Sequence, residues 1–136
     1  KEEAEEAGGH SGKIHSNVRQ RWLAKDAEVV DAMNHFADIA ARGRQLLLAK
    51  ERGGIEEEAF AEAFAALLRE NFGLRRAIFG DQALGGMVAM AAVAEAQGAA
   101  AKLTGSGGAL VVFCPRGQAQ AEATRAAAQA AGYTFM

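Results

Sequence analysis

The stretch from residue 99 to residue 114, "AAAKLTGSGGALVVFC", constrains the fold more than any other part of the sequence. The short apolar runs "AAAKL" and "ALVVFC" are typical of buried strands because turn residues bound them. Three of the five residues between the two runs are glycines, and a hairpin turn needs fewer. We therefore expect two paired strands, joined by a connection with more glycines than a turn requires.

The residues before this stretch follow the spacing of helices. Ser16 is the expected N-cap of a short helix, and Asp26 is the expected N-cap of a long helix over residues 27–51. Gly43 weakens the middle of the long helix, and "RGG" at residues 52–54 stops it. Its apolar residues at helical spacing are expected to face the core: Met33, Phe36, Ala37 and Ala40.

A second long helix is expected from Glu56 to Asn71, with an apolar stripe that includes Phe60, Phe64 and Leu67. The segment "FGLRRAIFGD" has a glycine near each end and reads as a separate helical turn or short helix. Asp81 is the expected N-cap of a single helix over "QALGGMVAMAAVAEAQ".

After the strands, "QAQAEATRAAAQAA" predicts a helix that Gly132 stops, and "YTFM" reads as a last strand. The order is about four helices followed by strand, loop, strand, helix and strand. This order predicts an α+β fold in which helices cover one face of a small, mainly antiparallel sheet. With 136 residues, half of them hydrophobic, the chain fits one domain with a buried core.

The charge and the apolar runs argue against several classes of partner. A net charge of −2, from 15 basic and 17 acidic residues, gives no reason to expect nucleic acid or an anionic membrane. The longest apolar run is far shorter than the ~18–20 residues of a membrane span. The lone Cys114 inside "LVVFCP" reads as a structural thiol in a reducing compartment, so we expect a cytoplasmic protein.

The beginning of the chain is acidic and small. The residues "KEEAEEAGGHSG" lack the basic start and apolar centre of a secretory signal, and residues 1–12 read as a linker or a truncated segment. The first residue is Lys rather than Met. We therefore expect the chain to begin partway through a larger protein.

The glycine stretch itself has two interpretations. Its backbone can adopt positive φ and present successive N–H groups to an anion, with hydroxyl groups from Thr104 and Ser106. Alternatively, it is a glycine-rich hairpin turn. It lacks the Gly-Lys-Ser/Thr ending of a P-loop and precedes a strand rather than a helix. Spacing alone leaves both interpretations open.

The stretch "GAAAKLTGSGGALVVFCP", after a helix that ends "VAEAQG", resembles the C-terminal glycine motif of the GHMP small-molecule kinases. The order of elements upstream is also similar. Within that family, "SGKIHSNVRQRWL", "NFGLRRAIFGD" and "KLTGSGGALVVFCP" together look most like the glucuronokinases of plants and algae. The resemblance covers residues 11–136. It implies that residues 13–136 form the ferredoxin-like C-terminal domain of such a kinase.

The resemblance implies an activity with ATP and Mg²⁺, in which D-glucuronate is phosphorylated at its anomeric hydroxyl to the 1-phosphate for UDP-sugar synthesis. The loop Thr104, Gly105, Ser106, Gly107 and Gly108 would then lie beside the transferred phosphate. The loop is shorter than in most of the family, a departure that the glucuronokinases share.

A larger departure is that the family's Pro-containing Gly-Leu-x-Ser-Ser loop is absent, and the only proline is Pro115. That loop and the catalytic Asp or Lys belong to an N-terminal ATP-binding domain. We therefore expect this chain to need that domain as a partner and to be inactive alone. The alternative is a non-catalytic α+β binding or interaction module with the same fold.

Several polar residues are candidates for substrate binding. Arg75 and Arg76 could hold the carboxylate of a sugar acid, since arginine binds that group bidentately, or both could be solvated surface charges. Ser11 falls where the family chain enters its C-terminal region, near the substrate cleft. Arg19 and Arg21 are two residues apart on the first helix and so point to different sides, and at most one of them is expected to face a site. Lys102, just before the loop, reads either as a phosphate ligand or as a charge at a strand edge.

The remaining polar and aromatic candidates favour structural roles. No two of the three histidines are spaced four apart on one helix, so the sequence predicts no metal site. His35 reads as a helix-surface residue. Trp22 reads as an anchor in the core or at a domain interface.

Overall fold

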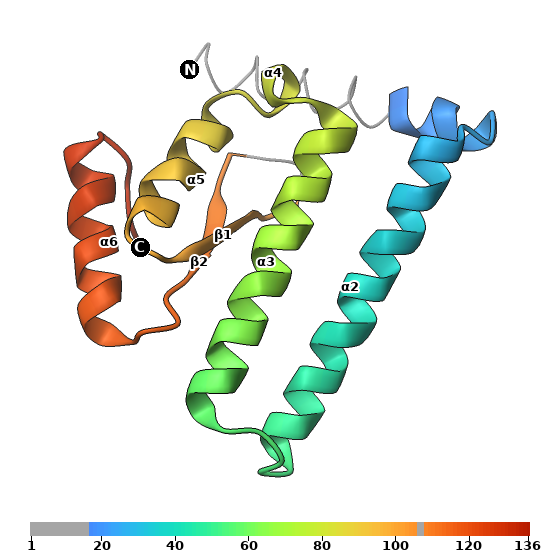
Figure 1. Cartoon of the computed structure of the whole chain (residues 1–136). Helices are drawn as coiled ribbons and strands as arrows, with labels where there is room; N and C mark the ends of the chain where they lie inside the picture. Colours follow the sequence, from blue (N-terminus) through green and yellow to red (C-terminus); the bar gives the residue numbers. More distant parts are fainter. Residues whose placement is uncertain (1–16, 106–107) are drawn as a thin grey trace.

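The computed structural model describes residues 17–105 and 108–136 of the chain. Helices dominate, and the sheet in the described residues is one antiparallel pair of strands (Figure 1). The predicted α+β class is confirmed. After a helical stretch over residues 17–23, the elements are α2 (Ala27–Glu51), α3 (Glu57–Phe79), α4 (Asp81–Leu84), α5 (Gly86–Ala96), β1 (Ala100–Leu103), β2 (Leu110–Phe113) and α6 (Gln118–Ala130).

The helices α2 and α3 form an antiparallel hairpin (Figure 1). Asp26 caps α2 as predicted, because its Oδ1 accepts a hydrogen bond of 3.1 Å from the backbone N–H of Glu28. The helix runs through Gly43 and ends at Glu51. Gly53 follows in a left-handed conformation with φ of 68°. The predicted bounds of this helix are therefore confirmed.

The predicted end of α3 at Asn71 is wrong. The segment read as a separate helical turn continues α3 through Gly73 to Phe79. Phe72 and Ile78 are both buried on this extension, at 7% and 8% exposure. Burying two large apolar side chains, at about 1.5–3 kcal/mol each, outweighs the cost of about 1 kcal/mol for a glycine inside a helix.

The predicted core face of α2 is partly wrong. Ala37 and Ala40 are exposed, and Met33 and Phe36 are only half-buried. α2 packs along α3, so the stripe that it buries is narrow. The buried residues of α2 are Val29, Ala32 and Ile39.

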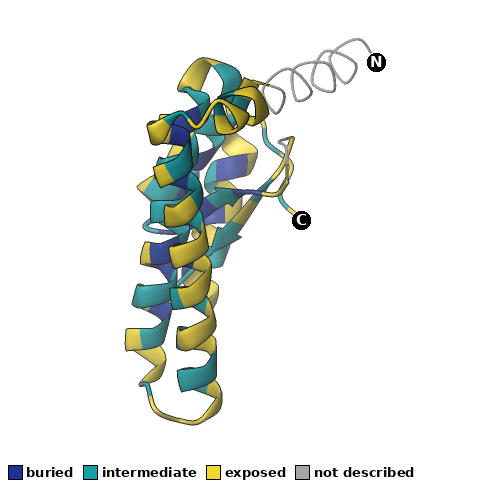
Figure 2. Cartoon of the chain, turned by 90° about the vertical axis from the view of Figure 1, so that its right-hand side faces the viewer, coloured by how far each residue is buried: buried dark blue, intermediate teal, exposed yellow. Residues whose placement is uncertain are grey.

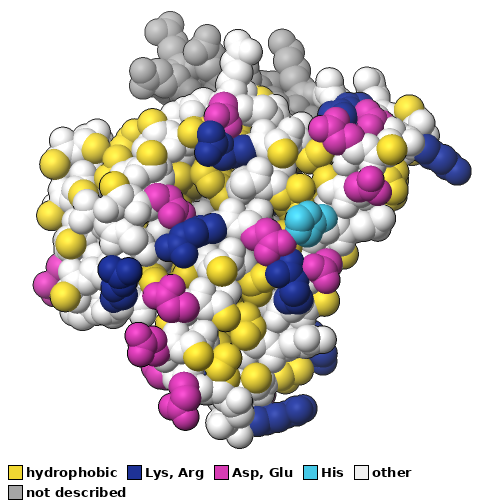
Figure 3. Space-filling view, viewed as in Figure 1, with side chains coloured by type: hydrophobic (Ala, Val, Ile, Leu, Met, Phe, Trp, Pro, Cys, Tyr) yellow, Lys and Arg dark blue, Asp and Glu magenta, His cyan; other side chains and the backbone are white. Residues whose placement is uncertain are grey.

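A polar cluster joins the two long helices at their surface. Glu70 of α3 accepts hydrogen bonds of 2.6 Å and 3.0 Å from the guanidinium of Arg42, and its Oε1 lies 2.6 Å from His35 Nε2. His35 is exposed, as predicted, and Figure 3 shows it beside its acidic and basic neighbours. These hydrogen bonds, from Arg42 first and His35 second, lower the pKa of Glu70 to about 2.

The main core lies between α3, α5 and one face of the sheet. Strand alternation places Ala101 and Leu103 on this face, at 0% and 1% exposure. Figure 2 shows the buried residues gathered where the helices face one another and the strands. The buried members of this core are Phe72, Ala91, Ala94, Ala99, Ala101 and Leu103.

On the opposite face of the sheet, the described residues pack closely at the end near Phe113. There the ring of Phe64 on α3 packs edge-on against Phe113, with centroids 5.2 Å apart. Lys102 and Val111 are paired across the strands nearer the loop, and Val111 is 47% exposed. In the described part of the chain, the sheet is therefore partly exposed next to the loop.

The turn between α5 and β1 is held from two sides. Arg69 of α3 binds Glu95 at 3.0 Å and donates to the carbonyls of Gly98 and Ala99 at 2.9 Å and 3.4 Å. Gln120 of α6 donates to the carbonyl of Gln97 at 2.9 Å. This turn fixes where β1 begins.

Two further predictions are corrected. Gly85, with φ of 53°, divides the expected single helix into α4 and α5, and Asp81 makes no capping hydrogen bond.

The predicted last strand is wrong, because residues 133–136 form no strand. Instead, Tyr133 N–H bonds back to Ala128, and Phe135 lies 5.7 Å from the guanidinium of Arg125.

Other expectations have mixed outcomes. Trp22 is 44% exposed, so its assignment to the core is wrong and the interface interpretation stays a prediction. Cys114 is half-buried just after β2, with its Sγ 4.0 Å from the hydroxyl of Thr124. Ser16 lies outside the described residues. Within those residues, every helix is too short or too polar to cross a membrane.

We expect Gly98→Ala to destabilise the chain by more than the ~1–2 kcal/mol cost of a left-handed alanine. Gly98 has φ of 76°, and a Cβ there would lie 3.1 Å from Gln120 Nε2. Gly53→Ala is the matched control, because Gly53 has φ of 68° and open space around it. Thermal unfolding measures both, and equal losses would contradict the packing argument.

The Glu70 cluster predicts a pH dependence of stability. The folded pKa of Glu70, about 2, lies below the usual 4.5 of the unfolded chain. Its contribution to the free energy of unfolding is therefore complete above pH 4.5 and is lost as the pH falls toward 2. Urea unfolding at several pH values should show this loss in the native sequence and a smaller one in Glu70→Gln. Parallel curves would rule it out.

Candidate functional site

The loop between β1 and β2 is closed at its mouth by Thr104. Its backbone N–H donates to the carbonyl of Ala109 at 3.2 Å, and its hydroxyl donates to the same oxygen at 3.0 Å. The hydroxyl hydrogen of Thr104 is thus used within the loop. Toward a ligand, the Thr104 hydroxyl oxygen can then only accept a hydrogen bond. Within the described structure, the residue holds the two ends of the loop together.

The glycines at the two ends of the loop have the backbone conformation expected from the sequence. Gly105 has φ of 58° and Gly108 has φ of 83°, and a Cβ at either position would meet nothing within 4 Å. Both glycines are exposed, and no described group accepts a hydrogen bond from either N–H. These amides can donate to an anion. Ser106 and Gly107, also predicted for this site, lie outside the described residues.

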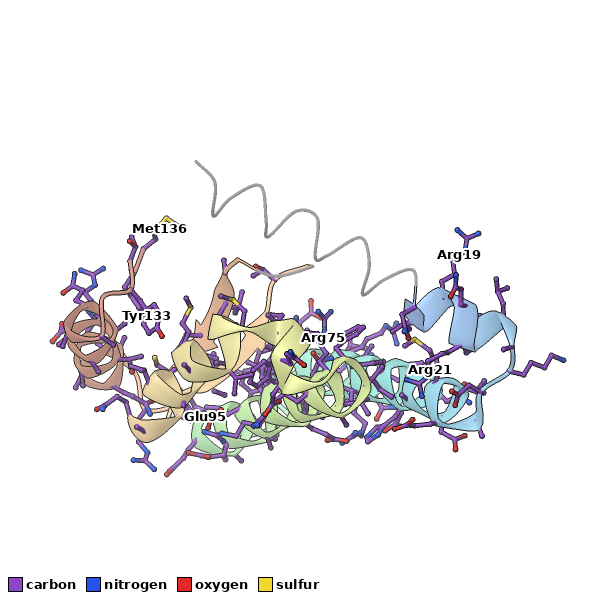
Figure 4. The ribbon with its side chains drawn as sticks, turned by 90° about the horizontal axis from the view of Figure 1, so that it is seen from above. Arg19, Arg21, Arg75, Glu95, Tyr133 and Met136 are labelled. Atoms are coloured by element: carbon purple, nitrogen blue, oxygen red, sulfur yellow. The ribbon has the colours of Figure 1, made fainter. Side chains whose placement is uncertain are left out.

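Arg75 reaches this loop from α3. Its Nη1 donates to the carbonyl of Gly105 at 2.8 Å, which ties the side chain to the backbone of the loop. Arg75 is half-buried, and burial lowers the pKa of its guanidinium. Figure 4 shows Arg75 near the middle of the molecule, by the end of α3. Of the predicted substrate-binding residues that are described, Arg75 is the one in contact with the loop.

Lys102 lies close to Arg75 at the base of the loop. Its Nζ donates to the carbonyl of Leu103 at 3.1 Å. Burial lowers the pKa of Lys102 most, and the positive charge of Arg75 lowers it further. The sequence offered no direct signal for this proximity, because the two residues come from different elements.

Arg76 differs from its neighbour Arg75. Its guanidinium binds both carboxylate oxygens of Asp81, at 2.7 Å and 2.6 Å. The hydrogen bonds raise the pKa of Arg76 and lower that of Asp81. Arg76 is exposed and already neutralised by this ion pair. The geometry therefore favours the surface-charge interpretation for Arg76.

The other predicted residues are not brought to the loop by the described structure. Arg19 is exposed on the first helical stretch and extends away from the rest of the molecule in Figure 4. Arg21 turns to Asp26 and Glu28 instead, so the two arginines point to different sides as expected. Ser11 lies outside the described residues. Within the described ranges, no three His, Cys, Asp or Glu side chains are grouped as metal ligands.

One buried polar residue in the C-terminal half of α3 was not among the predicted site residues. Asn71 lies one turn before Arg75 on the same helical face, and its Oδ1 is buried without a partner in the described structure. A buried carbonyl oxygen without a donor is costly, so this atom is a candidate acceptor for a further group. No sequence pattern could have found it, because its burial depends on tertiary packing.

The chain is similar to two curated plant proteins. It is 48% identical over 111 residues, or 81% of the chain, to the probable glucuronokinase 2 of Arabidopsis thaliana. It is 43% identical over 126 residues, or 92% of the chain, to glucuronokinase 1 of the same organism. These similarities confirm the resemblance to a glucuronokinase-like C-terminal region of the GHMP kinases.

The chain is much shorter than these relatives. It covers 28% of the first and 32% of the second. No family model matches the chain, and no solved structure matches it. The chain spans about a third of the length of these relatives.

Replacing Thr104 with Val should loosen the mouth of the loop. The change keeps the shape of the side chain and removes the hydroxyl bond to Ala109, a loss of at most about 1 kcal/mol for an exposed group. We expect faster hydrogen exchange at the amide of Thr104, measured by NMR. Thr134→Val, an exposed control outside the loop, should leave that amide unchanged. Unchanged exchange in Thr104→Val would contradict this role.

Proposed function

Because this chain is homologous to the glucuronokinases over most of its length, we propose that it is the C-terminal part of an ATP-dependent sugar kinase. The proposed reaction transfers the γ-phosphoryl group of ATP to the anomeric hydroxyl of D-glucuronate and gives the 1-phosphate. The observation that carries the proposal is the combination of this similarity with a loop in which the N–H groups of Gly105 and Gly108 have no acceptor among the described residues. UDP-sugar synthesis in the cytoplasm is the proposed setting.

The loop contributes electrostatic stabilisation in this proposal. In phosphoryl transfer, negative charge spreads over the oxygens of the moving group, and fixed N–H donors stabilise that charge without reorganising. Gly105 and Gly108 supply such donors from a backbone that Thr104 and Arg75 hold in place. Ser106 and Gly107 belong to the same proposed phosphate loop by position in the sequence.

We assign the rest of the machinery to an N-terminal domain. The described residues offer no group of carboxylates for Mg²⁺. The chain itself carries no Gly-Leu-x-Ser-Ser loop for ATP. Mg²⁺, most of the ATP contacts and the catalytic base are therefore proposed to come from the part of the kinase that this chain does not cover. Alone, the chain is expected to show no turnover.

The four proposed substrate-binding residues have unequal support. Arg75 contacts the loop and is not engaged by a carboxylate in the described structure. Arg76 is held by Asp81, and Arg19 extends away from the rest of the molecule in Figure 4. Ser11 remains a proposal from the sequence alone. Arg75 is therefore the residue for which the contacts favour a role in binding the sugar.

The kinase proposal is tested with the protein encoded by the whole reading frame that contains this chain. We expect ADP release with D-glucuronate above that with galacturonate, galactose or arabinose, and none from the 136-residue chain alone. Turnover by the isolated chain would contradict the assignment of the remaining machinery to an N-terminal domain. A start of translation near its first residue would favour the non-catalytic alternative.

In that full-length protein, Gly105→Val should lower kcat/KM by about a hundredfold, the usual cost of losing an oxyanion contact, because valine does not keep φ of 58° and its N–H is then displaced. Gly53→Val is the matched control. Both glycines have positive φ and open space around them, but Gly53 lies in the turn between the long helices. Equal rates for the two variants would remove the proposed role of the loop, provided that circular dichroism shows both to be folded.

A further inference from the structure

The half-buried cations of the described structure are ion-paired with two exceptions. A cation that is partly withdrawn from water is normally stabilised by a carboxylate. The half-buried lysines and arginines that form such ion pairs are Arg21, Arg42, Lys50 and Arg69. The two that form none with any described residue are Arg75 and Lys102.

These two cations lie together at the base of the loop. Arg75 donates to the carbonyl of Gly105, and Lys102 donates to that of Leu103. They are close enough for the charge of Arg75 to lower the pKa of Lys102. Each of these hydrogen bonds uses one donor, whereas a guanidinium has five N–H groups and an ammonium has three. Both side chains therefore retain donors for an anion between them.

We propose that Arg75 and Lys102 form a carboxylate-binding pair that makes the site selective for sugar acids over neutral sugars. The inference rests on the proposed kinase function, which places a sugar next to the loop. Two like charges held together in a half-buried position are stabilised by an oxyanion that lies between them and offsets their repulsion. The planar fork of Arg75 matches a carboxylate, and the ammonium of Lys102 adds a second charge.

The chemistry of a pyranose uronic acid fits this position. Its carboxylate is attached to one ring carbon next to the ring oxygen, and the anomeric carbon is the other. The carboxylate and the hydroxyl that accepts the phosphoryl group are therefore at the same edge of the sugar. If the carboxylate is held at the base of the loop, the anomeric hydroxyl lies near the N–H groups of Gly105 and Gly108 at the two ends of the loop.

The pair is tested by NMR titration of the 136-residue chain at constant ionic strength with D-glucuronate, D-glucose and inorganic phosphate. D-Glucose has the same ring with a neutral group in place of the carboxylate. We expect D-glucuronate to shift the amides of Lys102 and Gly105 and D-glucose to leave them unchanged. Absence of D-glucuronate binding would overturn the proposal, because both cations are in this chain. Tighter binding of phosphate at these amides would assign the pair to the transferred group instead.

Two variants separate the contributions of the cations. Lys102→Gln and Arg75→Lys should each weaken D-glucuronate binding by about tenfold, as expected when a charged hydrogen bond or a bidentate contact is lost. The exposed Arg44→Gln is the control and should leave the dissociation constant unchanged. Lys102→Gln keeps the contact of Arg75 with Gly105, so it remains informative if the arginine variant unfolds. Unchanged affinity in Lys102→Gln would refute the pair.

Failure of this inference is distinguishable from failure of the kinase proposal. If the full-length protein phosphorylates D-glucuronate and Lys102→Gln leaves its preference over galactose unchanged, the kinase stands and the pair is refuted. If D-glucuronate binds through the pair and the full-length protein shows no turnover, the pair stands and the kinase proposal is wrong.

Discussion

The guanidinium of Arg69 connects three parts of the molecule at one point, and the position of the loop depends on it. From α3 it binds Glu95 near the end of α5 and the carbonyls of Gly98 and Ala99, immediately before β1. Backbone carbonyls at a half-buried turn need donors, and here a side chain supplies them. Because β1 starts at this turn, the contact sets how the strand and the loop after it lie against α3.

Paired charges organise the surface around that connection. Glu70 joins the two long helices, and Asp81 holds Arg76 where α3 gives way to α4. Exposed ion pairs of this kind add little stability one by one, but they orient the side chains that they engage. They also decide which cations are left for other tasks. Within residues 17–105 and 108–136, Arg75 and Lys102 are the two half-buried cations without a carboxylate partner, and this is why we propose them as the anion-binding pair.

Local sequence signals were sufficient where one residue type controls the backbone. Asp26 and the glycines after Glu51 set the ends of α2, and the glycines between the apolar runs separate the two strands. The signals failed where packing outweighed propensity. Gly73 did not end α3 because buried apolar residues lie on both sides of it, and residues 133–136 had no neighbouring strand to join in the described sheet.

The sequence by itself determined the glucuronokinase-like relationship, the α+β class and the place of the glycine loop, since these depend on residue identity and order along the chain. Only the tertiary structure decided which side chains meet that loop. Arg75 and Arg76 are consecutive and chemically identical, yet they point about 100° apart around a helix. One reaches Gly105 and the other Asp81. The proximity of Lys102 to Arg75 likewise arises from packing a strand beside a helix, which no local pattern encodes.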